Sequence, residues 1–227
     1  MPAPISLVIP TLNAANALPA MLASTMEGLS QGLLRELVVT DGGSTDNTRA
    51  IADGAGARWI AGSAGRGGQL ARGCAAARGD WLLILHADTV LMPGWSSAVA
   101  DALSTPSRAH VFRLAFRTTG LGALWTSGWA NLRTRAFGLP YGDQGLLLHR
   151  ALYETAGGYP DIPLMEDVAL IGALTSAPRL MRATAETSAA RYLAEGWLRR
   201  GARNLWTLAR YRAGVSPERL ARQYHKP

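Results

Sequence analysis

The sequence of 227 residues contains a single cysteine, Cys74, and no long hydrophobic run. One cysteine excludes a disulfide framework and a zinc site built from several thiolates. The alanines that follow Cys74 predict a small buried helix residue there rather than a nucleophile. No apolar stretch approaches the ~20 residues of a membrane-spanning helix, and the N-terminal segment lacks the basic residues of a signal peptide. We therefore expect a cytoplasmic protein.

Common nucleotide-binding and nucleic-acid-binding motifs are also missing. Gly65 and Gly67 begin like the dinucleotide pattern G-x-G-x-x-G, but Leu70 stands where the third glycine belongs. The P-loop is excluded because the chain has no Gly-Lys-Ser/Thr triplet. Zinc-finger spacing, an aromatic RNA-binding signature, internal repeats and low-complexity tracts are absent from the sequence. We expect no nucleic-acid partner.

The composition that is present is typical of one globular core. Hydrophobic residues make up 48% and charged residues 17% of the chain, a balance that excludes a disordered protein. The length is enough for one sizeable core. The formal net charge of +7 indicates anionic partners, and both diphosphate groups and anionic lipids meet that condition.

Short apolar runs alternate with helical patterns through the first half of the chain. The expected strands and helices are, in order, 5–9, 17–28, 36–40, 47–55, 58–61, 69–78 and 81–85. This alternation predicts an α/β fold with a mostly parallel sheet and helices on both faces.

Carboxylates follow two of these expected strands. Asp41 comes directly after the strand at 36–40, and Asp88 comes shortly after the strand at 81–85. Ligands of open α/β sheets bind beyond the carboxyl ends of the strands, so the two carboxylates are expected at one functional edge. Asp88 alone is equally compatible with a residue that caps a loop or a helix.

The second half of the chain is less regular. Its expected elements are helices at 95–104, 122–137, 166–174 and 194–212, a helix that begins near 150, a short final helix after Ser216, and strands at 109–117 and 146–148. Trp125 and Trp129 lie one helical turn apart and are expected in the core. Glu166 and Asp167 stand at a helix start, where acidic residues often only complement the helix dipole.

The helix expected at 194–212 has two contrasting faces. Leu198, Ala202, Leu205 and Ala209 share a face that is expected to pack against the protein. The other face carries Trp206 and the arginines Arg199, Arg203 and Arg210. This basic face has three possible roles, which are solvation, contact with a diphosphate, and peripheral contact with the inner face of a membrane.

Five short motifs stand in a characteristic order along the chain. They are Ile9-Pro10-Thr11-Leu12-Asn13, Asp41-Gly42-Gly43-Ser44-Thr45-Asp46, Gly79-Asp80, His86-Ala87-Asp88 and Glu166-Asp167. Together they resemble the motifs of the family 2 glycosyltransferases, inverting enzymes with the GT-A fold, over the part of the chain up to about residue 175. The sequences His-Ala-Asp-Thr and Gly-Asp-Gln-Gly resemble a small bacterial subgroup that is labelled as arsenosugar-biosynthesis transferases.

The resemblance implies a binding site for a nucleotide-sugar donor, with uridine as the expected nucleoside. The residues that it assigns to the nucleotide are Pro10, Thr11, Asn13, Asp41, Gly43, Arg66 and Gln69. Asp41 is expected to accept a hydrogen bond from the uracil ring. Asp143 and Gln144 are expected near the transferred sugar and the acceptor, and Arg191 is the expected clamp on the diphosphate.

The resemblance also implies a divalent metal, Mn²⁺ or Mg²⁺, at an Asp-x-Asp motif. His86 replaces the first aspartate of that motif, and Asp88 matches the metal-binding one. Three roles stay open for His86, namely a metal ligand, a contact to the donor sugar or simple packing. An imidazole ligand would shift the preference toward Mn²⁺. Glu166 and Asp167 match the catalytic pair of the family, with Asp167 as the general base.

These assignments predict a metal-dependent inverting transferase that acts on a hydroxyl of a small-molecule or lipid-linked acceptor. Two other functions compete with it. A non-catalytic nucleotide-sugar-binding module would explain His86 as decay of the metal motif. A sugar-phosphate nucleotidyltransferase would need a glycine-rich basic loop at residues 10–14, which the sequence lacks. We expect a transferase domain at 1–190 and a C-terminal helical extension at 191–227.

Overall fold

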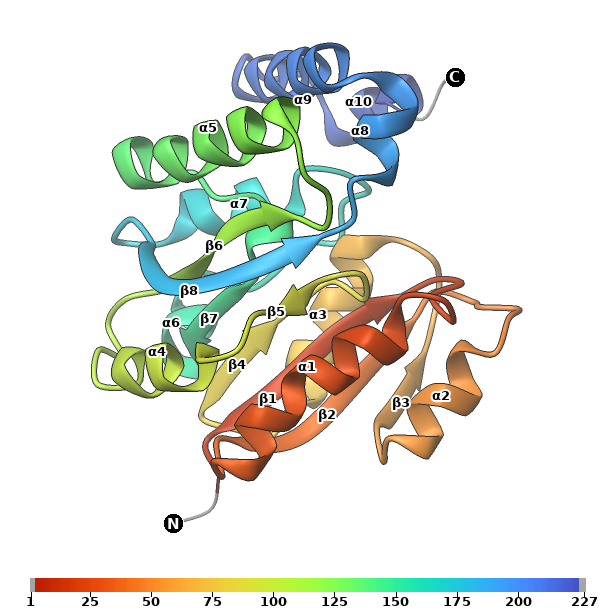
Figure 1. Ribbon diagram of the computed structural model, residues 1–227, viewed down its shortest axis with the longest axis vertical. Coiled ribbons are helices and arrows are strands. Elements are labelled where there is room, and N and C mark those ends of the chain that lie inside the picture. Colours follow the sequence, from red (N-terminus) through yellow and green to blue (C-terminus); the bar gives the residue numbers. More distant parts are fainter. Residues whose placement is uncertain (1–2, 225–227) are drawn as a thin grey trace.

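A computed structural model describes residues 3–224 of the protein (Figure 1). Its strands are β1 (Ile5–Thr11), β2 (Leu34–Asp41), β3 (Arg58–Ala61), β4 (Trp81–Ile84), β5 (Val90–Leu91), β6 (His110–Phe116), β7 (Leu146–His149) and β8 (Arg179–Thr187). Its helices are α1 (Leu18–Ser30), α2 (Thr48–Gly54), α3 (Arg66–Ala76), α4 (Trp95–Ala102), α5 (Leu121–Phe137), α6 (Arg150–Thr155), α7 (Glu166–Ala173), α8 (Ala190–Glu195), α9 (Trp197–Arg212) and α10 (Pro217–Tyr224). A short 3₁₀ helix, η1 (Gly142–Gln144), precedes β7.

The strands form one sheet in the order β3-β2-β1-β4-β7-β6-β8-β5. β1 pairs in parallel with both β2 and β4, and β6 pairs in parallel with β8. Among the strands of residues 3–224, only β5 and β7 run antiparallel to the rest. Because β7 is antiparallel to β4, its first residue Leu146 lies opposite Ile84, the last residue of β4. The loop before β7 therefore reaches the same edge as the carboxyl ends of β1, β2 and β4. The expected α/β fold is confirmed.

Helices cover both faces of this sheet, and the strand alternation explains why. Leu7 and Ile9 of β1 point to the face covered by α1 and α4, where Trp95 is fully buried. Val8 points to the opposite face and packs with Leu70 of α3. Cys74 is a buried free cysteine on that same face, as its alanine neighbours predicted.

Two strands were missed by the sequence analysis, and two helices have different bounds. β8 is the longest strand, but its buried positions include Ala183 and Ala185, whose small side chains give a weak alternation signal. β5 has only two residues. The helix expected at 194–212 is broken at Gly196, whose φ of 86° ends α8 before α9 begins. α3 begins at Arg66 rather than at 69, so part of the glycine-rich segment is helical.

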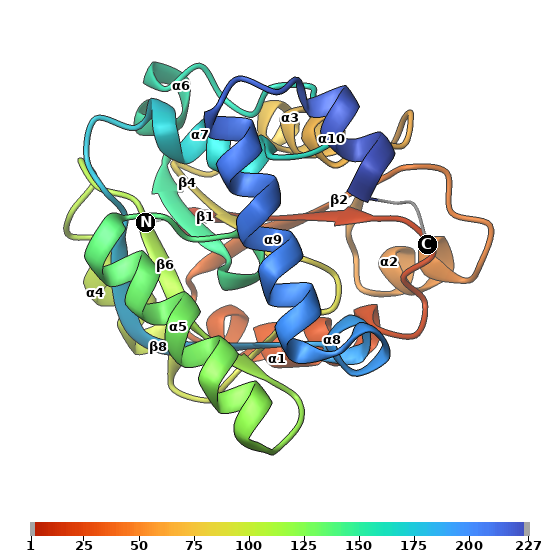
Figure 2. The same ribbon diagram turned by 90° about the horizontal axis from the view of Figure 1, so that it is seen from above.

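The expectation that Trp125 and Trp129 lie in the core is wrong, because their side chains are 70% and 41% exposed. α5 turns Ala123, Ala130 and Thr134 inward instead. The face of α9 that was expected to pack is exposed as well, with Leu198 at 78%. In Figure 2, α5 and α9 lie side by side on the upper surface of the molecule.

The C-terminal helices are attached to the sheet by an aromatic cluster. The ring of Phe116, at the end of β6, meets Tyr192 and Trp197 edge-on at centroid distances of 5.0 and 5.1 Å. Tyr192 and Trp197 stack on each other at 4.9 Å. The division of the chain at residue 190 stays a prediction.

Within residues 3–224, no helix combines the length and apolar character needed to cross a bilayer.

Candidate active site

A cavity of about 690 Å³ lies at the edge where β1, β4 and β8 end. The loops after β1 and β4 line one side, and η1 with the start of α7 lines the other. Most of the predicted site residues line this cavity, namely Pro10, Thr11, Asn13, Arg66, Gln69, His86, Asp88, Asp143, Glu166, Asp167 and Arg191. Asp41, Gly43 and Gln144 are outside the lining.

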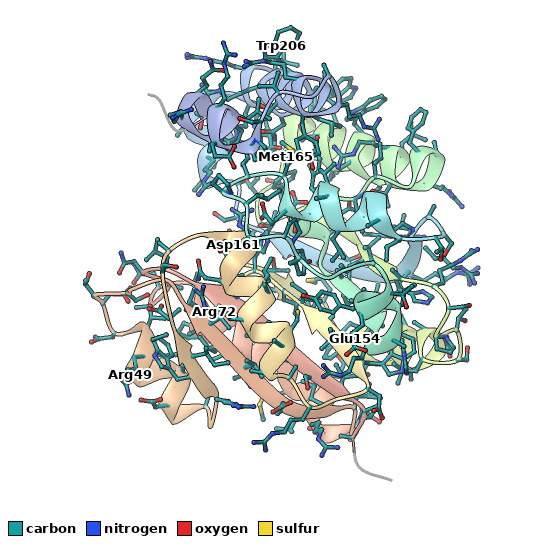
Figure 3. The ribbon with its side chains drawn as sticks, turned by 180° about the vertical axis from the view of Figure 1, so that it is seen from behind. Arg49, Arg72, Glu154, Asp161, Met165 and Trp206 are labelled. Carbon is teal, nitrogen blue, oxygen red and sulfur yellow. The ribbon has the colours of Figure 1, made fainter. Side chains whose placement is uncertain are left out.

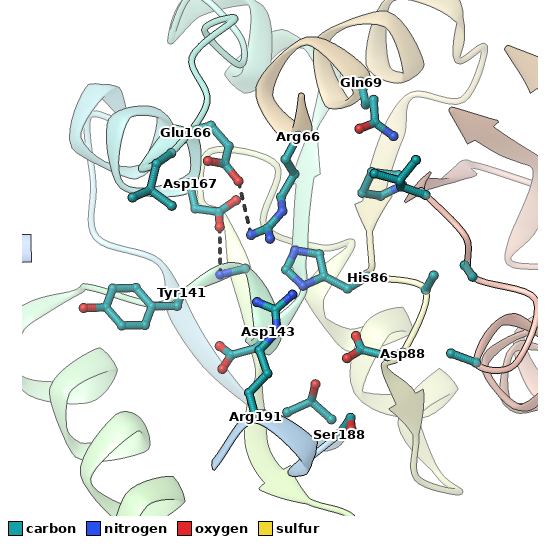
Figure 4. Close-up of a pocket in the computed structure, with 18 of the residues that line it drawn as sticks. Arg66, Gln69, His86, Asp88, Tyr141, Asp143, Glu166, Asp167, Ser188 and Arg191 are labelled. Carbon is teal, nitrogen blue, oxygen red and sulfur yellow. Dashed lines mark hydrogen bonds and ion pairs between the residues drawn. The ribbon is translucent and has the colours of Figure 1, made fainter. Parts of the chain in front are cut away.

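The carboxylate pair Glu166 and Asp167 occupies the first turn of α7. Glu166 is 2% exposed, and its Oε1 forms an ion pair with Nη1 of Arg66 at 3.4 Å. The backbone N–H of Gly142 donates a hydrogen bond of 3.0 Å to Oδ2 of Asp167. Figure 4 shows both contacts, with Arg66 directed toward the two carboxylates. The pair therefore does more than complement the helix dipole.

The pKa of Asp167 is raised to about 7. Burial is the largest cause, and the neighbouring charge of Glu166 adds to it, while Arg66 and the Gly142 N–H oppose the shift. A carboxylate with this pKa holds a proton more readily than an exposed aspartate. Such a value suits a general base that works near neutral pH.

Gly142 allows Asp167 and His86 to approach the same point. A Cβ added at Gly142 would lie 2.4 Å from Oδ2 of Asp167 and 2.7 Å from Nε2 of His86. The His86 Nε2 is buried without a hydrogen-bond partner among the described residues. Burial, together with the charges of Arg66 and Arg191, lowers the pKa of His86 to about 3. His86 is therefore neutral, and its unpartnered Nε2 lies against Gly142 at the wall of the cavity.

Asp88 and Asp143 place two further carboxylates at the cavity. Burial, followed by the negative charge of Asp88, raises the pKa of Asp143 to about 6 against the opposing charge of Arg133. Oδ1 of Asp143 is buried with no hydrogen-bond partner in the described chain. Nη2 of Arg117 donates a hydrogen bond of 3.0 Å to the backbone carbonyl oxygen of Asp88 and so holds the Asp88 loop.

Across residues 3–224, no group of three or more His, Cys, Asp or Glu side chains is arranged to hold a metal by itself. Mg²⁺ sites in enzymes commonly use one or two carboxylates and complete their shell with substrate phosphates and water. Asp88 and the unpaired Asp143 Oδ1 fit that type of site, in which the protein supplies only part of the shell.

Asp41 organises the loops around the cavity from a buried position. Its Oδ1 accepts hydrogen bonds from the hydroxyls of Thr11 and Ser44 at 2.9 and 2.5 Å. Its Oδ2 accepts the backbone N–H groups of Gly43 and Ser44, both at 2.7 Å. These donors lower the pKa of Asp41 although burial opposes the change. The predicted hydrogen bond from a uracil ring to Asp41 stays a prediction. A carboxylate offers about four acceptor sites, so the ring would have to displace one of these four donors.

Asn13 links the first loop to the motif that follows β2. Its backbone adopts φ 50°, and its Oδ1 accepts the Thr45 N–H at 2.9 Å. Ser44 in turn accepts the Asn13 N–H at 2.8 Å. The two motifs 9–13 and 41–46 therefore form one hydrogen-bonded unit beside the cavity.

The two glutamines in the predicted site brace backbone segments. Nε2 of Gln69 donates to the carbonyl oxygens of Thr11 and Thr40 at 2.7 and 2.8 Å, which ties α3 to the ends of β1 and β2. Gln144 is fully buried. It accepts a hydrogen bond of 2.7 Å from the Thr134 hydroxyl and donates one of 3.1 Å to the Phe112 carbonyl oxygen. Gln144 thus positions η1 rather than lining the cavity.

Apart from Arg191, the sequence analysis missed the wall that the C-terminal helices and the residue before them contribute. The lining residues that it missed include Ser188, Tyr192, Arg200, Asn204 and Tyr224. Arg200 and Asn204 lie one turn apart on the inner side of α9, opposite the exposed Leu198 face. A polar pair with i, i+4 spacing on the side away from the leucines was the available signal.

Sequence comparison decides the family. Residues 6–148 match the family described as Glycosyl transferase family 2. The chain belongs to glycosyl transferase family 2. The motifs that suggested the resemblance lie inside or shortly after the matched segment. No curated protein matches the chain in sequence, so the arsenosugar subgroup stays a prediction.

Solved glycosyltransferase structures share the fold. S. aureus TarS 1-349 superposes with a TM-score of 0.59 at 16% identity, covering 84% of this chain and 62% of that one. Glucosyl-3-phosphoglycerate synthase from Mycobacterium tuberculosis, in complex with Mn²⁺, UDP and phosphoglyceric acid, gives 0.55 at 23% identity over 82% and 68%. A complex of the same enzyme with Mn²⁺, UDP and glucosyl-3-phosphoglycerate has a TM-score of 0.57 at 20% identity. That match covers 94% of this chain and 81% of the other. This chain therefore spans less than two thirds of TarS 1-349.

Proposed function

We propose that this family 2 enzyme is a metal-dependent inverting transferase that moves a sugar from a UDP-sugar to a hydroxyl acceptor. The observation that carries the proposal is Asp167, a carboxylate with a raised pKa that is held by the Gly142 N–H inside the cavity. The fold neighbours crystallised with UDP, UDP-GlcNAc or Mn²⁺ support the choice of donor and metal. The two motifs joined by Asn13 are the proposed seat of the nucleotide.

Asp167 takes the proton from the acceptor hydroxyl as that oxygen attacks the anomeric carbon. The bond between the anomeric carbon and the donor phosphate oxygen breaks, and the nucleoside diphosphate leaves with the electron pair. A single displacement of this kind inverts the anomeric configuration and needs no second nucleophilic carboxylate. Glu166 keeps Arg66 beside the base through its ion pair.

Asp88 is the proposed metal ligand, and Oδ1 of Asp143, which has no hydrogen-bond partner among the described residues, is the proposed second contact to the cation or to the donor sugar. A divalent cation there would neutralise charge that grows on the leaving diphosphate. Arg191, at the start of α8, lines the cavity and is the proposed second clamp on that diphosphate. The proposed acceptor is a small molecule or a lipid-linked hydroxyl.

The competing function is a nucleotide-sugar-binding module without catalysis, and His86 is the residue that favours it. Calorimetric titration of UDP, with GDP as control, with and without Mn²⁺, tests the first part of the proposal. We expect UDP binding that depends on Mn²⁺ in the wild type and in Asp167→Asn, and at least tenfold weaker binding in Asp88→Ala.

Hydrolysis or transfer assays with UDP-sugars then separate the two functions. The transferase should turn over its donor, whereas a binding module would bind UDP and leave every donor intact. Binding of neither nucleotide would contradict both, and equal binding with and without Mn²⁺ would remove Asp88 as a metal ligand.

A further inference from the structure

Helix α5 exposes its large apolar side chains to solvent, whereas a surface helix normally buries them. Its outward side carries Leu121, Leu124, Trp125 and Leu132, with exposed fractions of 86%, 69%, 70% and 54%. Its inward side is built from small and polar residues that include Ala130. A helix on a soluble surface normally places its apolar stripe against the core. Contiguous exposed apolar area of this kind marks an interaction site.

Helix α9 extends the same apolar surface. Leu198, Leu205 and Trp206 are exposed by 78%, 41% and 65%. α5 and α9 are in contact, and Figure 2 shows both on one side of the molecule. Figure 3 shows Trp206 projecting from that side. We define the α5–α9 face as eight exposed apolar residues of the two helices, namely Leu121, Leu124, Trp125, Trp129, Leu132, Leu198, Leu205 and Trp206.

The charge on these helices has one sign. Neither α5 nor α9 contains an aspartate or a glutamate. Arg199 and Arg212 are exposed at the edges of the apolar stripe of α9, and Arg135 is exposed near the end of α5. Arg203 pairs with Glu195 of the neighbouring α8 at 2.9 Å. Exposed Trp and Leu bordered by Arg is the composition of helices that lie in the interface of an anionic bilayer.

We propose that the α5–α9 face docks on a membrane that contains anionic lipids. Tryptophan and leucine side chains would enter the boundary between headgroups and acyl chains, and the bordering arginines would meet lipid phosphates. A second copy of the chain fits this surface poorly. A two-fold contact would place two arginine-bordered helix pairs without acidic residues against each other.

Docking in this orientation places the cavity next to the bilayer. Arg200 and Asn204 line the cavity from the inner side of α9, whereas Leu198 and Leu205 are exposed on its outer side. One helix therefore separates the apolar face from the site. If the proposed transferase function holds, this arrangement favours an acceptor whose hydroxyl is attached to a lipid, although the docking itself does not depend on that function.

Co-sedimentation with vesicles tests the proposal directly. The full chain is mixed with vesicles of phosphatidylcholine alone and of phosphatidylcholine with phosphatidylglycerol, at low and high salt. We expect binding to the anionic vesicles that weakens with salt, and at least tenfold weaker binding for the double variant Leu124→Glu/Trp125→Glu. Arg199→Glu/Arg212→Glu should lose the preference for anionic lipid.

Leu29→Glu is the matched control, because Leu29 is 55% exposed on α1, outside the α5–α9 face. It should bind vesicles like the wild type, and circular dichroism should show that all variants are folded. Absence of vesicle binding by the wild type would overturn the proposal, as would equal loss in the Leu29 control. A dimer that Leu124→Glu/Trp125→Glu dissolves, without vesicle binding, would identify a second copy as the occupant.

UDP titration on the same variants keeps this proposal separate from the proposed function. Vesicle binding without UDP binding would leave the docking surface intact and contradict the transferase. UDP binding without vesicle binding would contradict the docking surface and leave the proposed transferase function standing.

Discussion

The proton affinity of Asp167 is set by residues that touch it or lie within its electrostatic reach. Burial and the Glu166 charge raise its pKa, and Arg66 and the Gly142 N–H lower it. Because a base must be ionised to accept a proton, activity is expected to rise with pH through the region near 7 and to fall on the acid side.

Substitution at the pair changes this pH profile in a defined direction. Glu166→Gln removes the negative charge that raises the Asp167 pKa and releases Arg66, which lowers it, so the acid limb of kcat/KM should move to lower pH. Asp167→Asn should reduce kcat by about 10²–10⁴ while UDP binding stays close to wild type. Steady-state rates between pH 5 and 9 measure both effects, and an unmoved acid limb in Glu166→Gln would reject Asp167 as the titrating base.

The motifs did not reveal what each of their residues contacts. Asp88 and Asp167 line the cavity, and their functional roles stay predictions. Asp41 and Gln144 sit in equally recognisable motifs, yet their polar atoms are used by neighbouring protein groups. A sequence shows the type of side chain and its place along the chain, whereas the hydrogen bonds that already occupy it come from segments far away.

At the scale of elements, the glycine-rich start of α3 serves close packing. A Cβ added at Gly67 would lie 2.3 Å from the carbonyl oxygen of Pro160 and 2.7 Å from that of Ile162. The segment that leads to α7 therefore lies directly on the backbone of α3. The sequence analysis placed the start of this helix at residue 69, after the glycines, because glycine spacing does not show which backbone passes nearby.

Gly67→Ala should destabilise the protein by about 1–3 kcal/mol, since backbone must move to admit the methyl group. Gly172→Ala is the matched helical control, because a Cβ there meets nothing within 4 Å. It should be neutral or stabilising by up to about 1 kcal/mol, owing to the better helix propensity of alanine. Urea unfolding measures both free energies, and equal values would show that α3 does not pack this closely.

Prediction of the elements failed where the usual hydrophobic pattern was weak or reversed. In β8 the buried positions are partly alanine, so the alternation carries little signal. In α5 the apolar residues face outward, so a rule that assigns tryptophan to the core gives the wrong face. The first half of the chain, where buried strands are continuous aliphatic runs, was predicted well for the same physical reason.

At the scale of the whole molecule, a small aromatic cluster joins the C-terminal helices to the sheet. Trp197 packs on Phe116 and Tyr192, and a Cβ added at Gly122 of α5 would lie 2.6 Å from its ring. Trp197 therefore joins α9 to both the sheet and α5. The same helices close one side of the cavity.

Trp197→Ala should loosen residues 190–224 more than the rest of the chain. The cost is expected below the ~3–5 kcal/mol of a fully buried tryptophan, because Trp197 is only half-buried. Limited trypsin digestion followed by mass spectrometry should show faster cleavage at the arginines of α8, α9 and α10 than in the wild type. Uniformly faster cleavage over all residues would indicate a single cooperative unit and argue against a division at residue 190.

The outward leucines and tryptophans of α5 also bear on how the enzyme would find its acceptor. A molecule seated on a bilayer shares a plane with any lipid-linked acceptor, and the two meet by lateral diffusion. Turnover would then follow the surface density of the acceptor rather than its amount per volume of solution. On the proposed docking, the outward apolar side of α5 would replace a search through three dimensions with a search through two.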